Sequence, residues 1–93
     1  MPLRHDFSIG LKAKLKKLFK KDRQRYKILM KKIESIAASD ETTIEHYKNL
    51  RHGQSDKKRV HIDKSFVLTF KYEKKRKFVL FLDFDHHGNV YKR

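Results

Sequence analysis

The sequence predicts an α+β fold in which an N-terminal helical hairpin packs on a small antiparallel β-sheet. Apolar residues recur at helical spacing in the first 40 positions, and after residue 58 they alternate or form β-branched and aromatic runs. The chain has 93 residues, of which 38% are hydrophobic and 7 are Phe and 4 Tyr, which is enough for one small core. We therefore expect residues 1–93 to form a single domain with the order β-α-α-β-β-β.

Two amphipathic helices are predicted between residues 8 and 39. Ser8 is placed to cap the first helix, where apolar residues recur at the i, i+4, i+7 and i+8 spacing of a buried stripe. The pattern breaks at Lys21 and Asp22, and the Asp22 carboxylate can cap a second helix that ends near Ser39 and Asp40. The two stripes are Leu11, Leu15, Leu18 and Phe19, then Tyr26, Leu29, Met30, Ile33 and Ala37.

A loop and a half-buried strand are expected next. Residues 40–56 are rich in polar and turn-forming residues, so we predict mostly loop there, with Leu50 as its anchor. In residues 59–63 apolar and polar side chains alternate, which places the two sets on opposite faces of a strand. The inward pair is Val60 and Ile62, and the outward side chains are Arg59, His61 and Asp63.

A β-hairpin is predicted from two aromatic and β-branched runs. These runs are residues 66–72 and 78–84, and the charged residues 73–77 join them as a turn. The other expected elements are a first strand within residues 3–7, a turn formed by His86, His87, Gly88 and Asn89, and a short last strand at Val90 and Tyr91.

The charge of the chain indicates a polyanionic partner. Its 25 Lys and Arg against 11 Asp and Glu give a formal charge of +14, and this charge is concentrated in residues 11–33 (11 basic, 1 acidic) and 57–77 (9 basic, 2 acidic). Either a nucleic acid or an acidic protein fits this distribution.

Several other classes are disfavoured. The chain has no cysteine, which excludes disulfides, thiol catalysis and cysteine-based zinc sites. It has no apolar run near the roughly 20 residues of a membrane span and no signal-peptide core, so we expect a soluble, cytoplasmic protein. No nucleotide-binding or hydrolase motif is present, and no cofactor is expected.

Two basic groups are candidate phosphate contacts. The first is the lysine-rich face of the first helix, which includes Lys16, Lys17 and Lys20; the alternative is a solvated helix face. The second surrounds His61 and comprises Lys48, Lys57, Lys58, Arg59 and Lys64.

RNA cleavage by attack of a ribose 2′-hydroxyl needs a base, an acid and cations, but no metal. His61 and His87 are candidates for the acid–base pair, with Tyr91 stacking on a base or orienting the phosphate. These histidines could equally be ordinary surface residues. Asp83, Asp85, His86 and His87 raise a metal-site alternative, which is weakened because adjacent histidines on an extended chain point in opposite directions.

The order and spacing of several motifs resemble the RelE/ParE toxin superfamily, and within it the YafQ-like branch. The motifs are Phe7-Ser8 leading into a Lys-rich helical hairpin, then Leu50, Lys58-Arg59-Val60-His61-Ile62, Phe66-Val67-Leu68-Thr69-Phe70-Lys71-Tyr72, and a last strand followed by Tyr91. In that branch one histidine lies on the strand that enters the hairpin and another lies four residues before a terminal aromatic. His61, His87 and Tyr91 occupy these places.

The resemblance implies the toxin of a type II toxin–antitoxin system, a RelE-like fold, and ribosome-dependent cleavage of mRNA in the A site. It implies an acidic RelB- or DinJ-like antitoxin, contacts with the ribosome and mRNA, and no membrane. His61 and His87 would be the acid–base pair, Tyr91 the orienting aromatic, and the Lys-rich helices the anchors on ribosomal RNA.

The chain departs from the family pattern at three positions. It has Lys48 where the branch has a further histidine, Ser65 where it has an aspartate, and Val67 where many RelE members have an arginine. Asp63 lies two residues from Ser65, so strand parity would allow it to replace that aspartate. The alternatives are a catalytically degenerate or ParE-like member that inhibits gyrase, and a non-catalytic basic protein that binds RNA or the ribosome.

Overall fold

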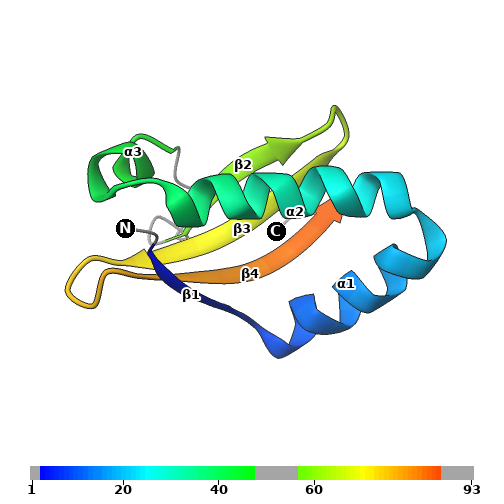
Figure 1. Ribbon diagram of the computed structural model, residues 1–93, viewed down its shortest axis with the longest axis horizontal. Helices are drawn as coiled ribbons and strands as arrows, with labels where there is room; N and C mark the ends of the chain where they lie inside the picture. Colours follow the sequence, from blue (N-terminus) through cyan, green and yellow to red (C-terminus); the bar gives the residue numbers. More distant parts are fainter. Residues whose placement is uncertain (1–2, 48–56, 87–93) are drawn as a thin grey trace.

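The computed structural model describes residues 3–47 and 57–86. In these residues three helices and four strands follow one another in nearly the predicted order (Figure 1). None of the described helices is long and apolar enough to cross a membrane. The elements are β1 (Arg4–Phe7), α1 (Ile9–Lys21), α2 (Arg23–Ala38), α3 (Glu41–Glu45), β2 (Lys58–Ile62), β3 (Phe66–Glu73) and β4 (Phe78–His86).

The strands form one sheet in the order β1-β4-β3-β2. The β2–β3 and β3–β4 pairs are antiparallel, as predicted, but β1 pairs with β4 in parallel. The prediction of a wholly antiparallel sheet was therefore wrong at this edge. The direction of β1 follows from the path of the chain through the helical hairpin, and the residues of β1 itself carry no information about it.

β4 extends further than predicted. It continues through His86, which pairs with Phe66 of β3, so His86 belongs to a strand and not to a turn. The register shifts between Thr69 and Phe70, which marks a β-bulge. The rest of the predicted turn (87–89), the strand at Val90 and Tyr91, and the Leu50 anchor lie outside the described residues.

Among residues 3–47 and 57–86, no strand pairs with the outer half of β4 on its β1 side. β1 pairs only with residues 78–81 of β4, and the chain then turns into α1, which runs beside the remainder of β4 (Figure 1). The Ser8 hydroxyl donates to the carbonyl of Leu82 at 2.6 Å, and Lys14 Nζ donates to the carbonyl of Phe84 at 3.3 Å. The side chains of Ser8 and Lys14 therefore donate hydrogen bonds to carbonyls of β4 that a neighbouring strand would otherwise bind.

The helix boundaries follow the predicted caps. Ser8 Oγ accepts from the backbone N–H of Leu11 at 3.1 Å, and the Asp22 carboxylate accepts from the backbone N–H of Arg25 at 3.1 Å. The backbone N–H of Asp22 also donates to Leu18 at the end of α1, so one residue closes the first helix and opens the second. α2 ends at Ala38, with Ser39 as its C-cap.

The predicted loop contains a short helix, α3. The Asp40 carboxylate caps it by accepting from Thr43 at 2.8 Å, and hydrogen bonds from the backbone and side chain of Thr43 lower the pKa of Asp40. Ile44 is fully buried against the core, which fixes the helix in place. Lys58 Nζ donates to the carbonyls of Glu45 and Tyr47 at its far end.

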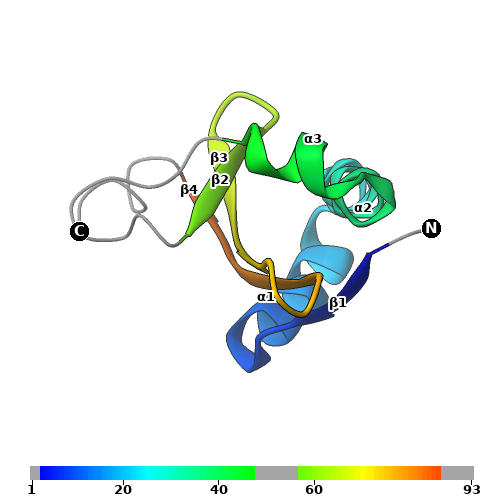
Figure 2. The ribbon, with the colours of Figure 1, turned by 90° about the vertical axis from the view of Figure 1, so that its left-hand side faces the viewer.

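The core lies between the helices and one face of the sheet, and Figure 2 shows this arrangement along the sheet. Val60 and Ile62 pack on this face and His61 is exposed, as predicted. The buried core side chains are Leu11, Leu29, Ile33, Ile36, Ile44, Ile62, Leu68, Phe70, Val79, Phe81 and Phe84.

Ser8→Ala should lower the free energy of unfolding by about 1–2 kcal/mol, because it removes both the cap of α1 and the hydrogen bond to β4. Ser35→Ala is the control: Ser35 is exposed on α2, and alanine favours a helix there. Urea denaturation of both variants measures the difference. Equal stability of the two would show that the Ser8 contacts contribute nothing.

Candidate functional site

The face of the sheet that points away from the helices carries polar side chains. Because side chains alternate along a strand and Val60 and Ile62 face the core, Arg59 and His61 lie on the opposite face. The register extends this face across three strands. Its two rows of paired residues are Arg59–Thr69–Asp83 and His61–Val67–Asp85.

His61 is the exposed imidazole of this face. Its cross-strand partner Val67 is completely buried, and Arg59 precedes it by one step on the same face. A guanidinium beside an imidazole on a rigid strand is an arrangement that can bind a phosphate and transfer a proton. His87, Tyr91 and Lys48, predicted to act with His61, lie outside the described residues.

Lys14 of α1 holds the two carboxylates at the edge of this face. Its Nζ lies 2.7 Å from Asp83 Oδ1 and 3.6 Å from Asp85 Oδ2, in addition to the bond to the carbonyl of Phe84. Within residues 3–47 and 57–86, no group of three or more acidic or imidazole side chains is placed to hold a metal. Nothing in the sequence distinguished Lys14 from the other lysines of the helix, so this role was not predicted.

The predicted basic residues around His61 have different environments. Lys64 and Ser65 are exposed in the turn between β2 and β3, and Lys57 is half-buried just before β2. The ammonium of Lys58 is bound to the end of α3, which gives this residue a structural contact that the sequence did not reveal. Of the predicted cations, Arg59 is the one that the strand register places in line with His61.

Asp63 lies in the turn that follows β2 and not in the strand itself. Its φ of 59° places it in the left-handed region, so strand parity no longer applies to it. Its carboxylate lies 3.7 Å from Nη2 of Arg25, whose Nη1 is 2.8 Å from Asp22. The same guanidinium lies 4.4 Å above the ring of Phe66. Arg25 thereby connects the helical hairpin to the turn between β2 and β3.

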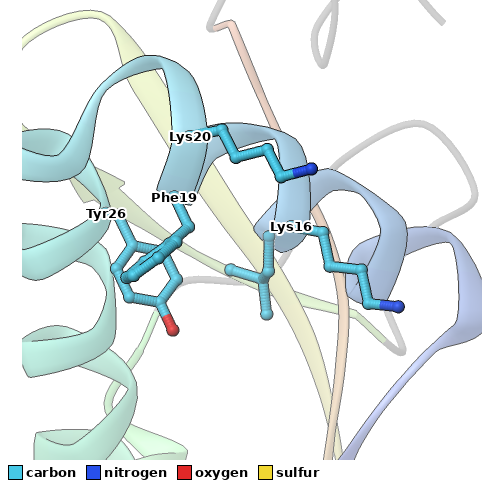
Figure 3. Close-up of a pocket in the computed structure, with 5 residues that line it drawn as sticks. Lys16, Phe19, Lys20 and Tyr26 are labelled. Atoms are coloured by element: carbon cyan, nitrogen blue, oxygen red, sulfur yellow. The ribbon is translucent and has the colours of Figure 1, made fainter.

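The helical hairpin presents a second candidate surface, a groove formed by Leu15, Phe19 and Tyr26. The cavity has a volume of about 350 Å³, and Phe19 remains 43% exposed. Phe19 packs edge to face on Tyr26, with ring centroids 5.0 Å apart. In Figure 3 the side chains of Lys16 and Lys20 extend away from these rings, so an apolar groove has a basic rim.

Comparison with known sequences gives two relatives that cover most of the chain. No protein-family model matches the chain. A candidate toxin, RelE4, of Methanocaldococcus jannaschii is 52% identical over 79 residues, which cover 85% of this chain and 80% of the relative. An uncharacterized protein of Methanosarcina mazei is 37% identical over 81 residues, which cover 87% and 90% of the two chains.

Solved structures with low sequence identity share the fold. The toxin–antitoxin complex RelBE2 of Mycobacterium tuberculosis contains a chain with a TM-score of 0.73 at 15% identity, covering 94% of this chain and 93% of that one. YafQ of E. coli gives a TM-score of 0.64 at 15% identity, with 96% and 98% covered. At this level of identity the likeness establishes the α+β fold.

Lys14→Met should lower the free energy of unfolding by about 1 kcal/mol, because it leaves two neighbouring carboxylates and an edge carbonyl without their common cation; partial exposure limits the effect. Lys12→Met is the control, since Lys12 makes only an exposed contact with Asp6 at 3.9 Å. Urea denaturation at low and high salt checks this, and the difference should shrink at high salt. A Lys12 variant as destabilised as the Lys14 variant would contradict it.

Proposed function

The chain belongs to the RelE family of toxins, and on this basis we propose that it is the toxin of a type II toxin–antitoxin system that cleaves mRNA on the ribosome. The observation that carries the proposal is the exposed His61, held on a strand in line with Arg59 on the polar face of the sheet. An imidazole and a guanidinium held on one face of a strand suit the phosphate and base of a single RNA strand.

The proposed reaction is an attack of a ribose 2′-oxygen on the adjacent phosphorus. A base removes the proton of the 2′-hydroxyl, the new P–O2′ bond forms as the P–O5′ bond breaks, and an acid protonates the departing 5′-oxygen. His61 and His87 would share these two proton transfers, and Tyr91 would orient the phosphate. Arg59 would stabilise the negative charge that develops on the phosphate oxygens.

The exposed lysines would supply the affinity for RNA. Lys16, Lys17 and Lys20 form one basic surface on α1, and Lys64 lies in the turn beside the polar face. Each phosphate contact adds affinity that does not depend on sequence, so these residues position the toxin while base contacts and the ribosome select the cleavage site. Lys48 and Lys57 are assigned to the same role, whereas Lys58 would contribute through the stability of α3.

The proposed protein partner is an acidic antitoxin that binds the helical hairpin. The RelBE2 neighbour is a toxin–antitoxin complex, and in this chain the groove of Leu15, Phe19 and Tyr26 offers apolar contact area with Lys16 and Lys20 on its rim. An amphipathic helix with acidic flanks would bury its apolar side chains here and neutralise the rim. RNA and antitoxin would then compete for the same basic helix.

Induced expression in a bacterium tests the enzymatic proposal. Wild type should arrest growth and produce new mRNA 5′ ends within codons, whereas His61→Ala and His87→Ala should lose about 10²-fold or more of the cleavage. His46→Ala is the control, because His46 is an exposed histidine at the end of α3. Primer extension or sequencing of 5′ ends provides the measurement.

The outcomes separate the alternatives. Arrest without cleavage would reject the nuclease and indicate another target such as gyrase. Normal growth with soluble, folded protein would reject an active toxin in that host and leave a degenerate or binding-only member. Cleavage that survives both alanine substitutions would reject the assignment of the two histidines.

A second prediction concerns the antitoxin. Phe19→Glu should weaken its binding by about 10- to 100-fold, because it removes apolar contact and places a carboxylate in the groove. Ile28→Glu is the matched control: Ile28 is equally exposed, at 42% against 43%, but does not line the groove. Calorimetry measures both affinities, with the antitoxin first identified as a small acidic protein that co-purifies with the wild-type chain. Binding that disappears in moderate salt would reveal simple charge attraction and contradict an apolar interface.

A further inference from the structure

A separate pocket lies on the other side of α1, between this helix and the ends of β3 and β4. It has a volume of about 240 Å³, and apolar side chains of Leu18, Phe66 and Phe84 line it. Lys17 and Lys21 of α1, one helical turn apart, also line it. It shares no lining residue with the hairpin groove, which is lined by Leu15, Lys16, Phe19, Lys20 and Tyr26.

The aromatic wall of this pocket is held in place from several directions. The rings of Phe66 and Phe84 are stacked, with centroids 5.0 Å apart and planes 12° from parallel. Arg25 lies over Phe66 at 4.4 Å, and His86 meets the edge of the same ring at 5.5 Å. A flat ligand entering the pocket would therefore meet an ordered apolar surface.

The carboxylates at this end of the molecule are already paired. Arg25 contacts Asp22 and Asp63, and Lys14 contacts Asp83 and Asp85. Among the described residues that line the pocket, Asp85 is the one acidic side chain, and its partner Lys14 also lines it. Within residues 3–47 and 57–86, by contrast, no ion pair involves Lys17 or Lys21. An apolar slot thus has two cations available for an anion.

We propose that this pocket binds one base of a single-stranded RNA, with the flanking phosphates on Lys17 and Lys21. The proposal rests on the proposed function in taking RNA as the ligand, and it adds a second contact point away from the reacting phosphate. A nucleotide combines a flat ring with an adjacent anion, which matches an aromatic wall beside two ammonium groups.

Size and position favour RNA over an acidic peptide. The volume is below the 300 to 1,000 Å³ or so of whole-ligand pockets, so it suits one ring and not the row of side chains on a helix. Asp85, which lines the pocket, also ends the row that contains His61, two strands and therefore about 10 Å away. A short RNA strand crossing the edge of β4 could occupy the pocket and the face of His61 together.

The test uses a short, 2′-O-methylated RNA that carries one 2-aminopurine, whose fluorescence falls when it stacks. Wild type should quench it, and replacing that base by an abasic site should weaken binding about tenfold or more. K17A/K21A should lose the quenching and reduce the salt dependence of log K by about 1.4, from two phosphate contacts. K27A/K31A is the control, with the same charge change and spacing on α2, where both lysines are exposed and line neither pocket, and should still quench.

A second measurement locates the base directly. RNA with 5-iodouridine at the same position should crosslink to the tryptic peptide that contains Phe66 when irradiated. Equal quenching by both double variants, crosslinks confined to other peptides, or no binding of the RNA by wild type would each overturn the proposal. Capture of an acidic, tryptophan-containing peptide in place of RNA would also overturn it and assign the pocket to a protein partner.

The same variants separate this proposal from the proposed function. Codon-level cleavage by wild type in cells without quenching in vitro would overturn the pocket alone. Quenching that depends on Lys17 and Lys21, together with no cleavage in cells, would support the pocket and reject the nuclease.

Discussion

The open half of β4 is the constraint on which the other features depend. β1 is only four residues long, so β4 would expose backbone carbonyls over its second half if nothing covered them. The start of α1 supplies two donors instead, Ser8 to Leu82 and Lys14 to Phe84. These bonds fix α1 along the strand. The helix so placed forms one wall of the hairpin groove and one wall of the pocket beside Phe66 and Phe84. A fifth strand at this edge would satisfy the same carbonyls but would remove both surfaces.

The β-bulge decides which residues of β4 reach each face. Phe81 and Phe84 are three positions apart and would lie on opposite faces of a regular strand, yet both are buried in the core. The register shift absorbs one residue between them, because Phe70 pairs with Phe81 and Thr69 pairs with Asp83. Asp83 and Asp85 consequently share the face of His61, while Phe84 returns to the helix side and stacks on Phe66. The β-bulge therefore places Asp83 and Asp85 on the polar face and also places Phe84 in the wall of the pocket.

Local features of the sequence predicted much of the fold, whereas features that depend on contacts between distant residues could not be predicted. Ser8, Asp22 and Ser39 mark helix boundaries by short-range hydrogen bonds, so residue type and position were sufficient. The outward position of His61 followed from alternation in the same way. The direction of β1 and the burial of Ile44 in α3 depend on tertiary packing. The partners of Lys14 lie about 70 residues away in the sequence. Strand alternation predicted that Asp63 shares a face with His61, but the positive φ of Asp63 places it in a turn, where alternation does not apply. His87 and Tyr91 remain assignments by resemblance.

The pairing of charges explains how a small domain can fold with a net charge of +14 and still present cations to a partner. Two half-buried cations, Lys14 and Arg25, each contact two carboxylates near the end of the sheet. The acidic side chains there therefore form ion pairs that hold the helices against the sheet. Of the other lysines of α1, Lys16 and Lys20 lie at the rim of the groove, and Lys17 and Lys21 line the pocket. Self-repulsion among them disfavours the compact state, and a bound polyanion or acidic protein would relieve it. Binding and folding are therefore linked: a partner that neutralises α1 should also stabilise the helix that closes the edge of β4.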